Sequence, residues 1–443
     1  YTFKDRYMLT ASFRRDGYSA FGQKNPYADF PALALGWTFT EEKFMESVGW
    51  MNFGKLRLSY GVNGNRDLPR YEALAELQSG KYQYISPSGT IIPVSQLYVN
   101  RMENQDLKWE RTISYNVGLD FSFLNSRLTG SFDIYKKITE DLLILRKLPS
   151  VIGFDNVVSN LGEVQNKGFE ITLSSINMFN KNFEWRSTVN FWLNRNEIKH
   201  LYGPVNVYDA QGKVIGQEEK DDIVNRWFIG HDLDEIWDQK VLGVWQQSEA
   251  AEAAKYGVAP GDFKVQDVDG DGKYSDADRQ FLGFRTPRYQ WTFRNDFKIY
   301  RNFDFSFQLY ANWGMKSDYN QAKNNSGFQD RQNSYKFGYW KADNPTNEYA
   351  RLYSSNGSAG FSVYRNTSFI RLNNISLAYT VPKNLTQRAR IESVKMYVTV
   401  NNAFLYAPDW TFWDPEARNR ASDGAISTAI PPRIYTLGIN LTL

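Results

Sequence analysis

Apolar and polar residues alternate along much of the chain with a period of two. The alternation is clearest at Ile113–Phe123, Phe303–Trp313 and Tyr435–Leu443, where every second residue is apolar. This period is typical of a β-strand with one apolar and one polar face. Similar runs lie near 6–15, 31–40, 53–62, 127–138, 165–177, 183–199, 288–300, 368–381 and 391–406. We therefore predict an all-β chain of about twelve strands, many of them near the ~9–11 residues that a tilted strand needs to cross a bilayer.

The connections between the expected strands alternate between short and long. They are short near Asn125, Asn180 and Arg301, and long over 139–164, 200–287 and 315–367. A soluble sandwich also has alternating strands, but it has no reason for this asymmetry. Short periplasmic turns and long extracellular loops are characteristic of an outer-membrane barrel. The pattern predicts a transmembrane antiparallel β-barrel with 200–287 as a long extracellular loop region.

The composition agrees with a barrel and excludes several other classes. The chain has 13 Trp, 28 Tyr and 30 Phe, yet its mean hydropathy is -0.55. So many rings exclude a disordered chain, and a polar lumen would explain the hydrophilic mean. No apolar stretch of ~18 residues is present, so we expect no membrane-spanning helix. Rings near the expected strand ends are interpreted as girdles at the two membrane interfaces: Trp37, Trp109, Tyr135, Trp185, Trp291, Tyr300, Trp313, Tyr379 and Tyr435.

Catalytic and nucleic-acid-binding functions find little support in the sequence. The chain has no cysteine and only two histidines, His200 and His231, so thiol, iron–sulfur and Cys-ligated zinc chemistry are excluded. No GxSxG, HExxH or Walker motif is present. A net charge of +3 gives no basic face for nucleic acid. We expect no enzyme, no catalytic residues and no nucleic-acid partner.

One acidic stretch, 267–278, carries the spacing of a calcium-binding loop. Oxygen ligands stand at loop positions 1, 3, 5, 9 and 12, with Gly272 at position 6 and a backbone carbonyl available at position 7. The alternative is a solvated cluster of Asp-Gly turns on the surface. We predict a structural Ca²⁺ site, with calcium favoured over magnesium, that pins the long loop 200–287. Its expected ligands are Asp267, Asp269, Asp271, Lys273, Ser275 and Asp278.

Several blocks of sequence, spread from the first residues to the last, resemble one family. The blocks are Asp5–Gly17 followed by Phe21-Gly22, Asp106–Glu110 with Tyr115–Asp120, Asn166–Glu170, Phe369–Tyr379 with Pro382, Asp414–Glu416, and Pro432–Leu443. Together they resemble the SusC/RagA-type TonB-dependent transporters of Bacteroidota outer membranes. The resemblance implies that 1–443 is the C-terminal part of a 22-stranded barrel, with the plug domain and first strands absent or carried by a separate chain. A free-standing twelve-stranded barrel is the alternative.

The resemblance also implies a function and partners. These are active import of a nutrient across the outer membrane, driven through TonB, together with a SusD-like surface lipoprotein and the N-terminal part of the same transporter. The expected surroundings are outer-membrane lipid, and the expected substrate is an oligosaccharide or an oligopeptide. Other interpretations are a barrel that anchors a surface complex without transport, and a siderophore or cobalamin receptor.

Substrate contacts are predicted in the outer loops and on the strands. Loop tryptophans could stack on sugar faces, although loop aromatics could equally pack against one another or against the lipoprotein. Small polar residues on the strands would line the lumen. The candidates are Trp237, Trp340, Trp410, Trp413, Asn116 and Asp120.

Overall fold

The computed structural model describes most of the chain, in several segments. These are residues 1–19, 21, 24–148, 150–154, 156–323, 338–355, 360–410, 414–417 and 431–442. Most of the secondary structure in these segments is β-strand, as the period of two predicts.

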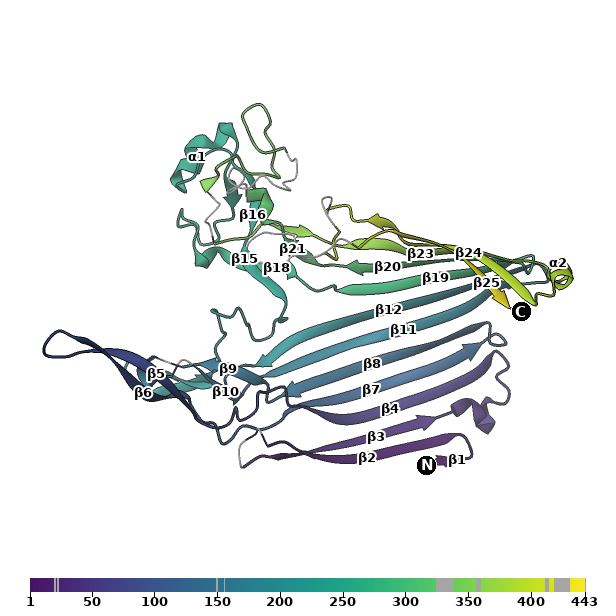
Figure 1. The fold of residues 1–443 in the computed structure, drawn as a ribbon, viewed down its shortest axis with the longest axis horizontal. Coiled ribbons are helices and arrows are strands. Elements are labelled where there is room, and N and C mark those ends of the chain that lie inside the picture. Colours follow the sequence, from purple (N-terminus) through teal and green to yellow (C-terminus); the bar gives the residue numbers. More distant parts are fainter. Residues whose placement is uncertain are drawn as a thin grey trace. The chain divides into compact units, whose positions relative to one another are not determined.

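Thirteen strands follow one another in a single antiparallel order of hydrogen bonding (Figure 1). Apart from the two-residue β1, they are 9 to 18 residues long. Each of the twelve runs predicted from the sequence coincides with one of the long strands. In order of pairing, the strands are β1 (Thr2–Phe3), β2 (Tyr7–Gly17), β3 (Tyr27–Trp37), β4 (Met51–Asn65), β7 (Glu110–Phe123), β8 (Leu128–Glu140), β11 (Glu163–Phe179), β12 (Phe183–His200), β19 (Tyr289–Ile299), β20 (Phe303–Trp313), β23 (Phe369–Thr380), β24 (Ser393–Tyr406) and β25 (Ile434–Thr442).

The two faces of these strands differ in chemistry. On β25, Leu437 and Ile439 are 79% and 62% exposed, although they are large aliphatic residues. They alternate with Thr436, Gly438 and Asn440, which point to the other face. An exposed apolar face backed by a polar one is the arrangement of a barrel wall between lipid and water.

The short connections are tight turns, as expected. Leu124, Asn125 and Ser126 have φ values of 54°, 57° and 62° in the turn between β7 and β8, and Tyr300 and Arg301 have φ values of 48° and 62° between β19 and β20. The left-handed region costs little for Asn, so Asn125 suits its turn.

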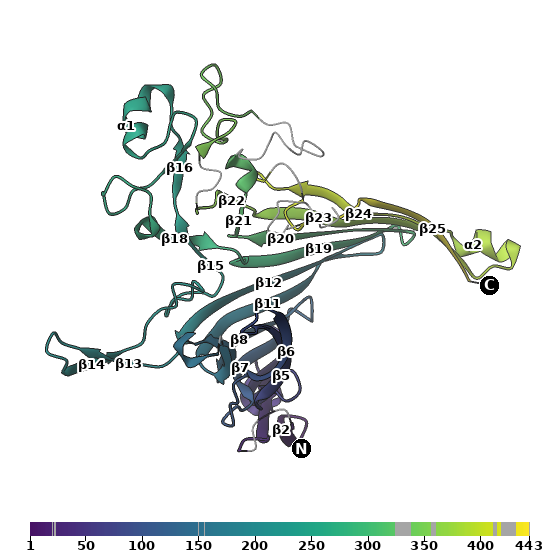
Figure 2. The ribbon, with the colours of Figure 1, turned by 60° about the vertical axis from the view of Figure 1, so that its left-hand side comes forward.

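The remaining strands form small hairpins and pairs within the long connections. They are β5 (Glu76–Ile85) with β6 (Ile91–Arg101), β9 (Leu143–Lys147) with β10 (Asn156–Asn160), β13 (Val205–Tyr208) with β14 (Val214–Glu218), β15 (Glu235–Gln239) with β18 (Arg279–Phe284), β16 (Val241–Val244) with β17 (Phe263–Val265), and β21 (Lys316–Asp318) with β22 (Tyr364–Asn366). The hairpin of β13 and β14 is seen best in Figure 2.

Helices are few and short. The α-helices are α1 (Ala250–Lys255) and α2 (Lys383–Thr386), and the 3₁₀ turns include Phe39–Glu41, Lys43–Met45, Ser150–Ile152, Gln247–Glu249, Asp276–Asp278, Asn320–Lys323 and Gln387–Ala389. Within the described segments, no helix is long and apolar enough to span a membrane.

The chain divides into two compact units. Unit 1 comprises Tyr1–Glu170 and Asn194–Leu233, and unit 2 comprises Ile171–Leu193 and Asp234–Leu443. In unit 1, a core that includes Phe21, Leu107 and Trp109 gathers beneath the connections. Trp109 is only 5% exposed and packs 5.2 Å from the ring of Phe21, so the prediction that it belongs to an interfacial girdle is wrong. A ring beside a strand end can as well be covered by the loop that follows it.

Candidate functional site

Three connections of unit 2 fold together into a lobe with its own core. Its buried residues come from 241–265, 319–363 and 410–417. Trp340 and Trp410 lie in this core, 8% and 6% exposed. The sequence left open whether loop tryptophans stack on sugars or pack within the loops. In the structure, the rings of Trp340 and Trp410 pack within the loops.

The other two tryptophans predicted to contact substrate differ in position. Trp237 lies on β15 and is half-buried, with the guanidinium of Arg279 5.4 Å from its ring centroid. Trp413 lies outside the described residues. Substrate binding by any of the four tryptophans stays a prediction.

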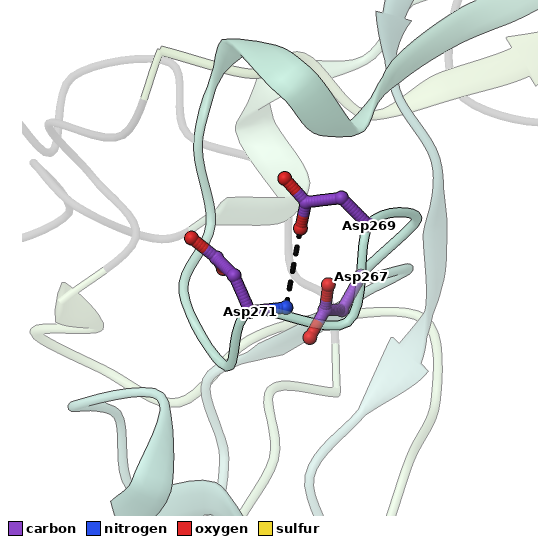
Figure 3. A group of neighbouring side chains, drawn as sticks. All are labelled: Asp267, Asp269 and Asp271. Carbon is purple, nitrogen blue, oxygen red and sulfur yellow. Dashed lines mark hydrogen bonds between the residues drawn. The ribbon is translucent and has the colours of Figure 1, made fainter.

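The predicted calcium loop brings three of its carboxylates together (Figure 3). One carboxylate oxygen each from Asp267, Asp269 and Asp271 lies within 4.8 Å of the others. Backbone amides orient these groups. Gly270 and Gly272 donate to Asp267 at 2.7 and 3.0 Å, and the amide of Asp271 donates to Asp269 at 3.2 Å. The result is a cluster of hard oxygen atoms of the kind that Ca²⁺ binds.

Asp278, the last residue of the loop pattern, is fully buried and accepts two backbone hydrogen bonds. The amides of Ser275 and Val268 donate to it at 2.8 and 2.7 Å. Ser275 caps the short turn that follows, since its hydroxyl accepts from the amide of Ala277 at 3.1 Å. The amide of Lys273 donates to Asp271 at 2.8 Å. Asp278 thus closes the loop, while Asp267, Asp269 and Asp271 form the group that could hold a metal.

Hydrogen bonds keep Asp267 ionised. Partial burial raises the pKa of this carboxyl group. Hydrogen bonds from the amides of Gly272 and Gly270 and from the hydroxyl of Tyr256 lower the pKa by a larger amount, so the net pKa lies below its ordinary value. A charged Asp267 at neutral pH suits cation binding, because metal ligands must be deprotonated.

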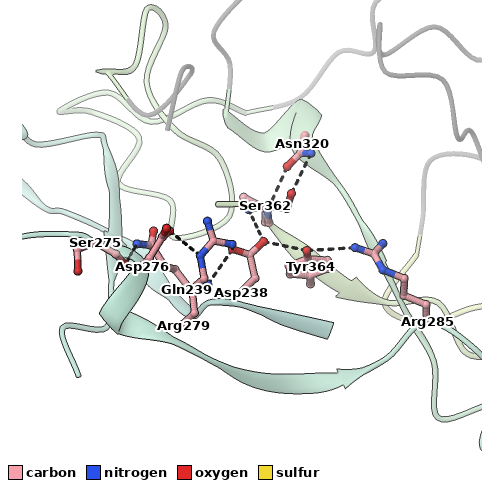
Figure 4. Close-up of polar contacts among 10 residues, drawn as sticks. Asp238, Gln239, Ser275, Asp276, Arg279, Arg285, Asn320, Ser362 and Tyr364 are labelled. Atoms are coloured by element: carbon pink, nitrogen blue, oxygen red, sulfur yellow. Dashed lines mark hydrogen bonds and ion pairs between the residues drawn. The ribbon is translucent and has the colours of Figure 1, made fainter. Parts of the chain in front are cut away.

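A second, buried carboxylate joins the loop to the rest of the lobe (Figure 4). Asp238 on β15 is 1% exposed and pairs with Arg279 at 3.3 Å. It also accepts from the hydroxyl of Tyr364 at 2.9 Å and the amide of Ser362 at 3.1 Å. The next residue, Gln239, donates its side chain to the carbonyl of Ser275. This network ties the calcium-type loop to β15, β18 and β22.

A third carboxylate, Asp262, stabilises the connection between β16 and β17. It is fully buried and accepts from Arg351 at 3.0 Å, from the amides of Ala259 and Ser355 at 3.0 and 3.1 Å, and from the Ser355 hydroxyl. Burial raises the pKa of Asp262. The hydrogen bonds from Ser355 and Ala259 and the Arg351 guanidinium lower it by a larger amount, so the net pKa lies below its ordinary value. Asp262 is therefore ionised in the folded lobe.

Asn116 and Asp120, the predicted lumen residues, lie on the polar face of unit 1. Arg57 donates to Asp120 through two nitrogens at 2.8 and 2.9 Å and to Asp133 at 2.8 Å. Asn116 donates to Asp133 at 2.9 Å. The polar face thus carries an internally paired network, and substrate contact by Asn116 or Asp120 stays a prediction.

Neutral hydrogen-bonding pairs cover much of the polar face of unit 2. Asn374 donates to Asn401 at 2.8 Å, and Asn190 donates to Thr292 at 2.8 Å. Nearer the short turns, Ser306, Ser376 and Ala378 line a recess of about 410 Å³ together with several charged side chains. This face is wettable along its length, as a lumen wall requires.

Sequence reasoning missed the carboxylates that organise the lobe. Asp238 and Asp262 have no motif, because their importance comes from burial against distant segments. It also missed Arg371, which is 3% exposed and pairs with Asp414 at 2.6 Å and Glu416 at 2.8 Å. Arg371 lies in one of the blocks that resemble the family and Asp414–Glu416 in another. The signal that could have revealed this ion pair was the presence of a cation in one family-like block and of two carboxylates in another.

Comparisons with known proteins agree on one type of barrel. Residues 1–289 match the family model described as TonB dependent receptor-like, beta-barrel. The chain is 31% identical to TonB-dependent receptor P26 of Formosa agariphila, over all of the chain and 45% of the relative. It is 29% identical to TonB-dependent receptor SusC of Bacteroides thetaiotaomicron, over all of the chain and 42% of the relative. The chain thus spans somewhat less than half the length of these curated relatives.

Solved structures give the same fold. The RagAB peptide transporter superposes with a TM-score of 0.76 over 99% of the chain and 46% of the transporter chain, at 22% identity. The RagAB peptide importer in its 'open-open' state superposes with a TM-score of 0.77 over 100% of the chain and 46% of the importer chain, also at 22% identity.

Proposed function

Because the chain belongs to the TonB-dependent receptor-like β-barrel family and hence to the outer membrane, we propose that it forms part of a transporter that imports a nutrient. Import would be active and coupled to TonB through the N-terminal part of the same transporter. The observation that carries the proposal is the set of twelve long antiparallel strands with one apolar and one hydrogen-bonding face. Strands with one apolar and one polar face are those of a barrel wall between lipid and an aqueous lumen.

The proposed partner is a SusD-like lipoprotein, and the proposed substrate is an oligosaccharide or an oligopeptide. Support for the partner comes from the similarity to SusC. Support for a peptide comes from the fold that the chain shares with the RagAB peptide transporter. Amides and hydroxyls on the polar face, such as Asn374 and Thr292, can bond to either substrate.

We also propose that 267–278 binds a structural Ca²⁺ ion. The support is the cluster of Asp267, Asp269 and Asp271 together with the spacing of the loop. Bound calcium would neutralise these carboxylates and fix the connection between β17 and β18. We propose no reaction for this chain, since the family to which it belongs consists of receptors.

Uptake by a strain that lacks the gene tests the transport proposal. The deletion strain, the complemented strain and a strain without TonB function would be supplied with labelled oligosaccharide and oligopeptide pools. We expect one pool to be depleted from the medium only when both the gene and TonB are present. Unchanged uptake of every tested glycan and peptide would contradict transport and favour a barrel that only anchors a surface complex.

A further inference from the structure

The apolar face of unit 1 carries a group of cations close to its exposed apolar side chains. The group lies on three neighbouring strands, β8, β11 and β12, in the half of these strands nearer the long connections. We call it the basic patch, and it consists of Lys136, Lys167, Arg195 and Lys199, with Glu197 among them.

The alternation of β8 places Lys136 on the lipid-facing side. Ile134 is 51% exposed on this face, and Lys136 follows it two residues later. The cross-strand partners on β7 are Val117 for Ile134 and Tyr115 for Lys136. Both are about half exposed, at 47% and 48%. At this level the face carries a tyrosine beside a lysine, between the aliphatic pairs Val117/Ile134 and Ile113/Ile138. A tyrosine beside a lysine is typical of a membrane interface.

The neighbouring strands β11 and β12 also carry charged residues on this face. The rings of Phe132 on β8 and Phe169 on β11 lie 6.0 Å apart, so these two strands share the apolar face. Lys167 precedes Phe169 by two residues and lies on the same face. Its ammonium group is 3.8 Å from Glu197 of β12. The opposite face of the same strands is identified by Asn166, which accepts from Asn194 at 2.9 Å.

The basic patch has an excess of positive charge. Glu197 is its one anion, and it pairs with Lys199 and more distantly with Lys167. Lys136 is exposed and lies close enough to Glu197 to interact with it electrostatically. Two further carboxylates lie on this face, closer to the long connections. Glu140 follows Lys136 by four residues, and Glu163 precedes Lys167 by four.

At the other end of this face, the described residues 119–123 of β7 and 128–133 of β8 include no lysine or arginine. Towards the short turn of β7, the face carries the stacked rings of Phe121 and Phe123, 5.0 Å apart, with Trp50 5.4 Å from Phe123. Rings alone suit an interface with neutral headgroups, whereas clustered lysine and arginine suit anionic ones.

We propose that the basic patch binds the phosphate groups of the glycolipid in the outer leaflet of the outer membrane. The patch lies on the apolar face next to Ile134 and Val117, where the headgroup of a lipid packed against these two residues would be found. Lysine and arginine form charge-assisted hydrogen bonds with phosphate oxygens. The ligand class is therefore a phosphorylated lipid headgroup, and the inference depends on the barrel family and not on the proposed transport.

Lipid binding by charge-neutralised variants tests the assignment. The full-length receptor in phosphatidylcholine nanodiscs would be titrated with labelled lipid A, alone and after enzymatic removal of its phosphates. We expect Lys136→Gln and Lys167→Gln each to weaken lipid A binding about fivefold, since a surface cation contributes ~1 kcal/mol towards an anionic lipid. The matched control is Lys137→Gln, one residue away on the polar face, which should bind as the wild type does.

Three outcomes would overturn the proposal. They are equal binding of lipid A by the wild type and the Lys136→Gln/Lys167→Gln double variant, equal affinity of the wild type for dephosphorylated lipid A, and complete displacement of lipid A by low-millimolar inorganic phosphate. The last result would mean that the patch recognises free phosphate and not a membrane lipid. Heat-modifiable migration on gels would verify that each variant is folded before it is titrated.

Discussion

Gly118 on β7 shows how a single missing side chain permits the charged network of the polar face. A Cβ atom at this position would lie 2.6 Å from the guanidinium carbon of Arg57 and would also collide with a carboxylate oxygen of Asp133. The guanidinium can therefore approach the strand this closely only because residue 118 is glycine. Arg57 then reaches Asp120 and Asp133 together.

Gly118→Ala should break this network. We expect a loss of about 1–3 kcal/mol in the free energy of unfolding, since overpacking separates charges that were paired. Urea unfolding in detergent would measure it. Gly61→Ala on β4 is the control, because its Cβ would meet nothing closer than Ala32 at 3.6 Å. Equal stability of the two variants would contradict the close-approach explanation.

Calcium binding is also decided at the residue scale. We expect the receptor to bind Ca²⁺ at or below millimolar concentration in calorimetric titration, and Asp267→Asn to weaken binding by about tenfold or more. Asp276→Asn is the matched control, since Asp276 is exposed and pairs with Arg279 outside the carboxylate cluster. An absence of binding by the wild type at millimolar Ca²⁺ would contradict the site.

At the scale of elements, the lobe of unit 2 depends on buried carboxylates that join separate loops. The pKa of Asp262 is lower in the folded lobe than its ordinary value of about 3.9. A lowered folded-state pKa contributes stability that is present at neutral pH and is lost as the pH falls below about 4. The lobe should therefore open on acidification.

Hydrogen exchange of 241–265 as a function of pH tests this prediction. We expect protection to fall below pH ~4 in the wild type, and Asp262→Asn to lose protection already at neutral pH, because Arg351 is left without its charged partner. Asp343→Asn, which removes an exposed carboxylate, should behave as the wild type does. Acid-insensitive protection in the wild type would be the contrary result.

Two adjacent residues of β20 test the assignment of its faces. Phe305 packs its ring 5.7 Å from Phe297 on the apolar face, whereas Ser306 lies in the charged recess of the polar face. Arginine at 305 should cost roughly 2–4 kcal/mol if the residue lies near the bilayer midplane. Ser306→Arg should cost little, because residue 306 lies on the polar face, where water can solvate the guanidinium. Similar folding free energies for the two variants would contradict the barrel assignment.

At the scale of the whole molecule, the hairpins in the long connections form sheets separate from the thirteen-stranded one. The hairpin of β5 and β6 pairs only with itself among the described strands, and Lys81 is the one charged residue between Glu76 and Arg101. Many of its apolar side chains are exposed, including Leu77 and Leu97 at 62% and 68%. Its contacts therefore contribute little to the wall.

Replacing residues 78–98 with a two-residue Asn-Gly turn should leave outer-membrane assembly intact. The long strands β4 and β7, which flank the hairpin, pair with each other over Met51–Asn65 without its help. Heat-modifiable migration and surface labelling would measure assembly. Loss of the folded species would show that the hairpin is needed for the wall to form.

The strands could be predicted from the sequence because their signal is local. Lipid on one side and water on the other impose a period of two on each strand separately, so Phe303–Trp313 or Tyr435–Leu443 can be recognised alone. The spacing of 267–278 is likewise local, and the structure brings Asp267, Asp269 and Asp271 together as that spacing predicts. The metal itself stays a prediction.

The sequence by itself thus determined the strand positions, the two faces and the family of this chain. Tertiary structure alone decided which rings are covered, as with Trp109 and Trp340, and which carboxylates are buried, as with Asp238 and Asp262. The physical reason is the distance along the sequence between the residues that decide each property. A strand's faces follow from its immediate neighbours, whereas burial in a lobe built from three connections depends on residues up to a hundred or more positions apart, such as Asp238 and Tyr364, a separation of 126.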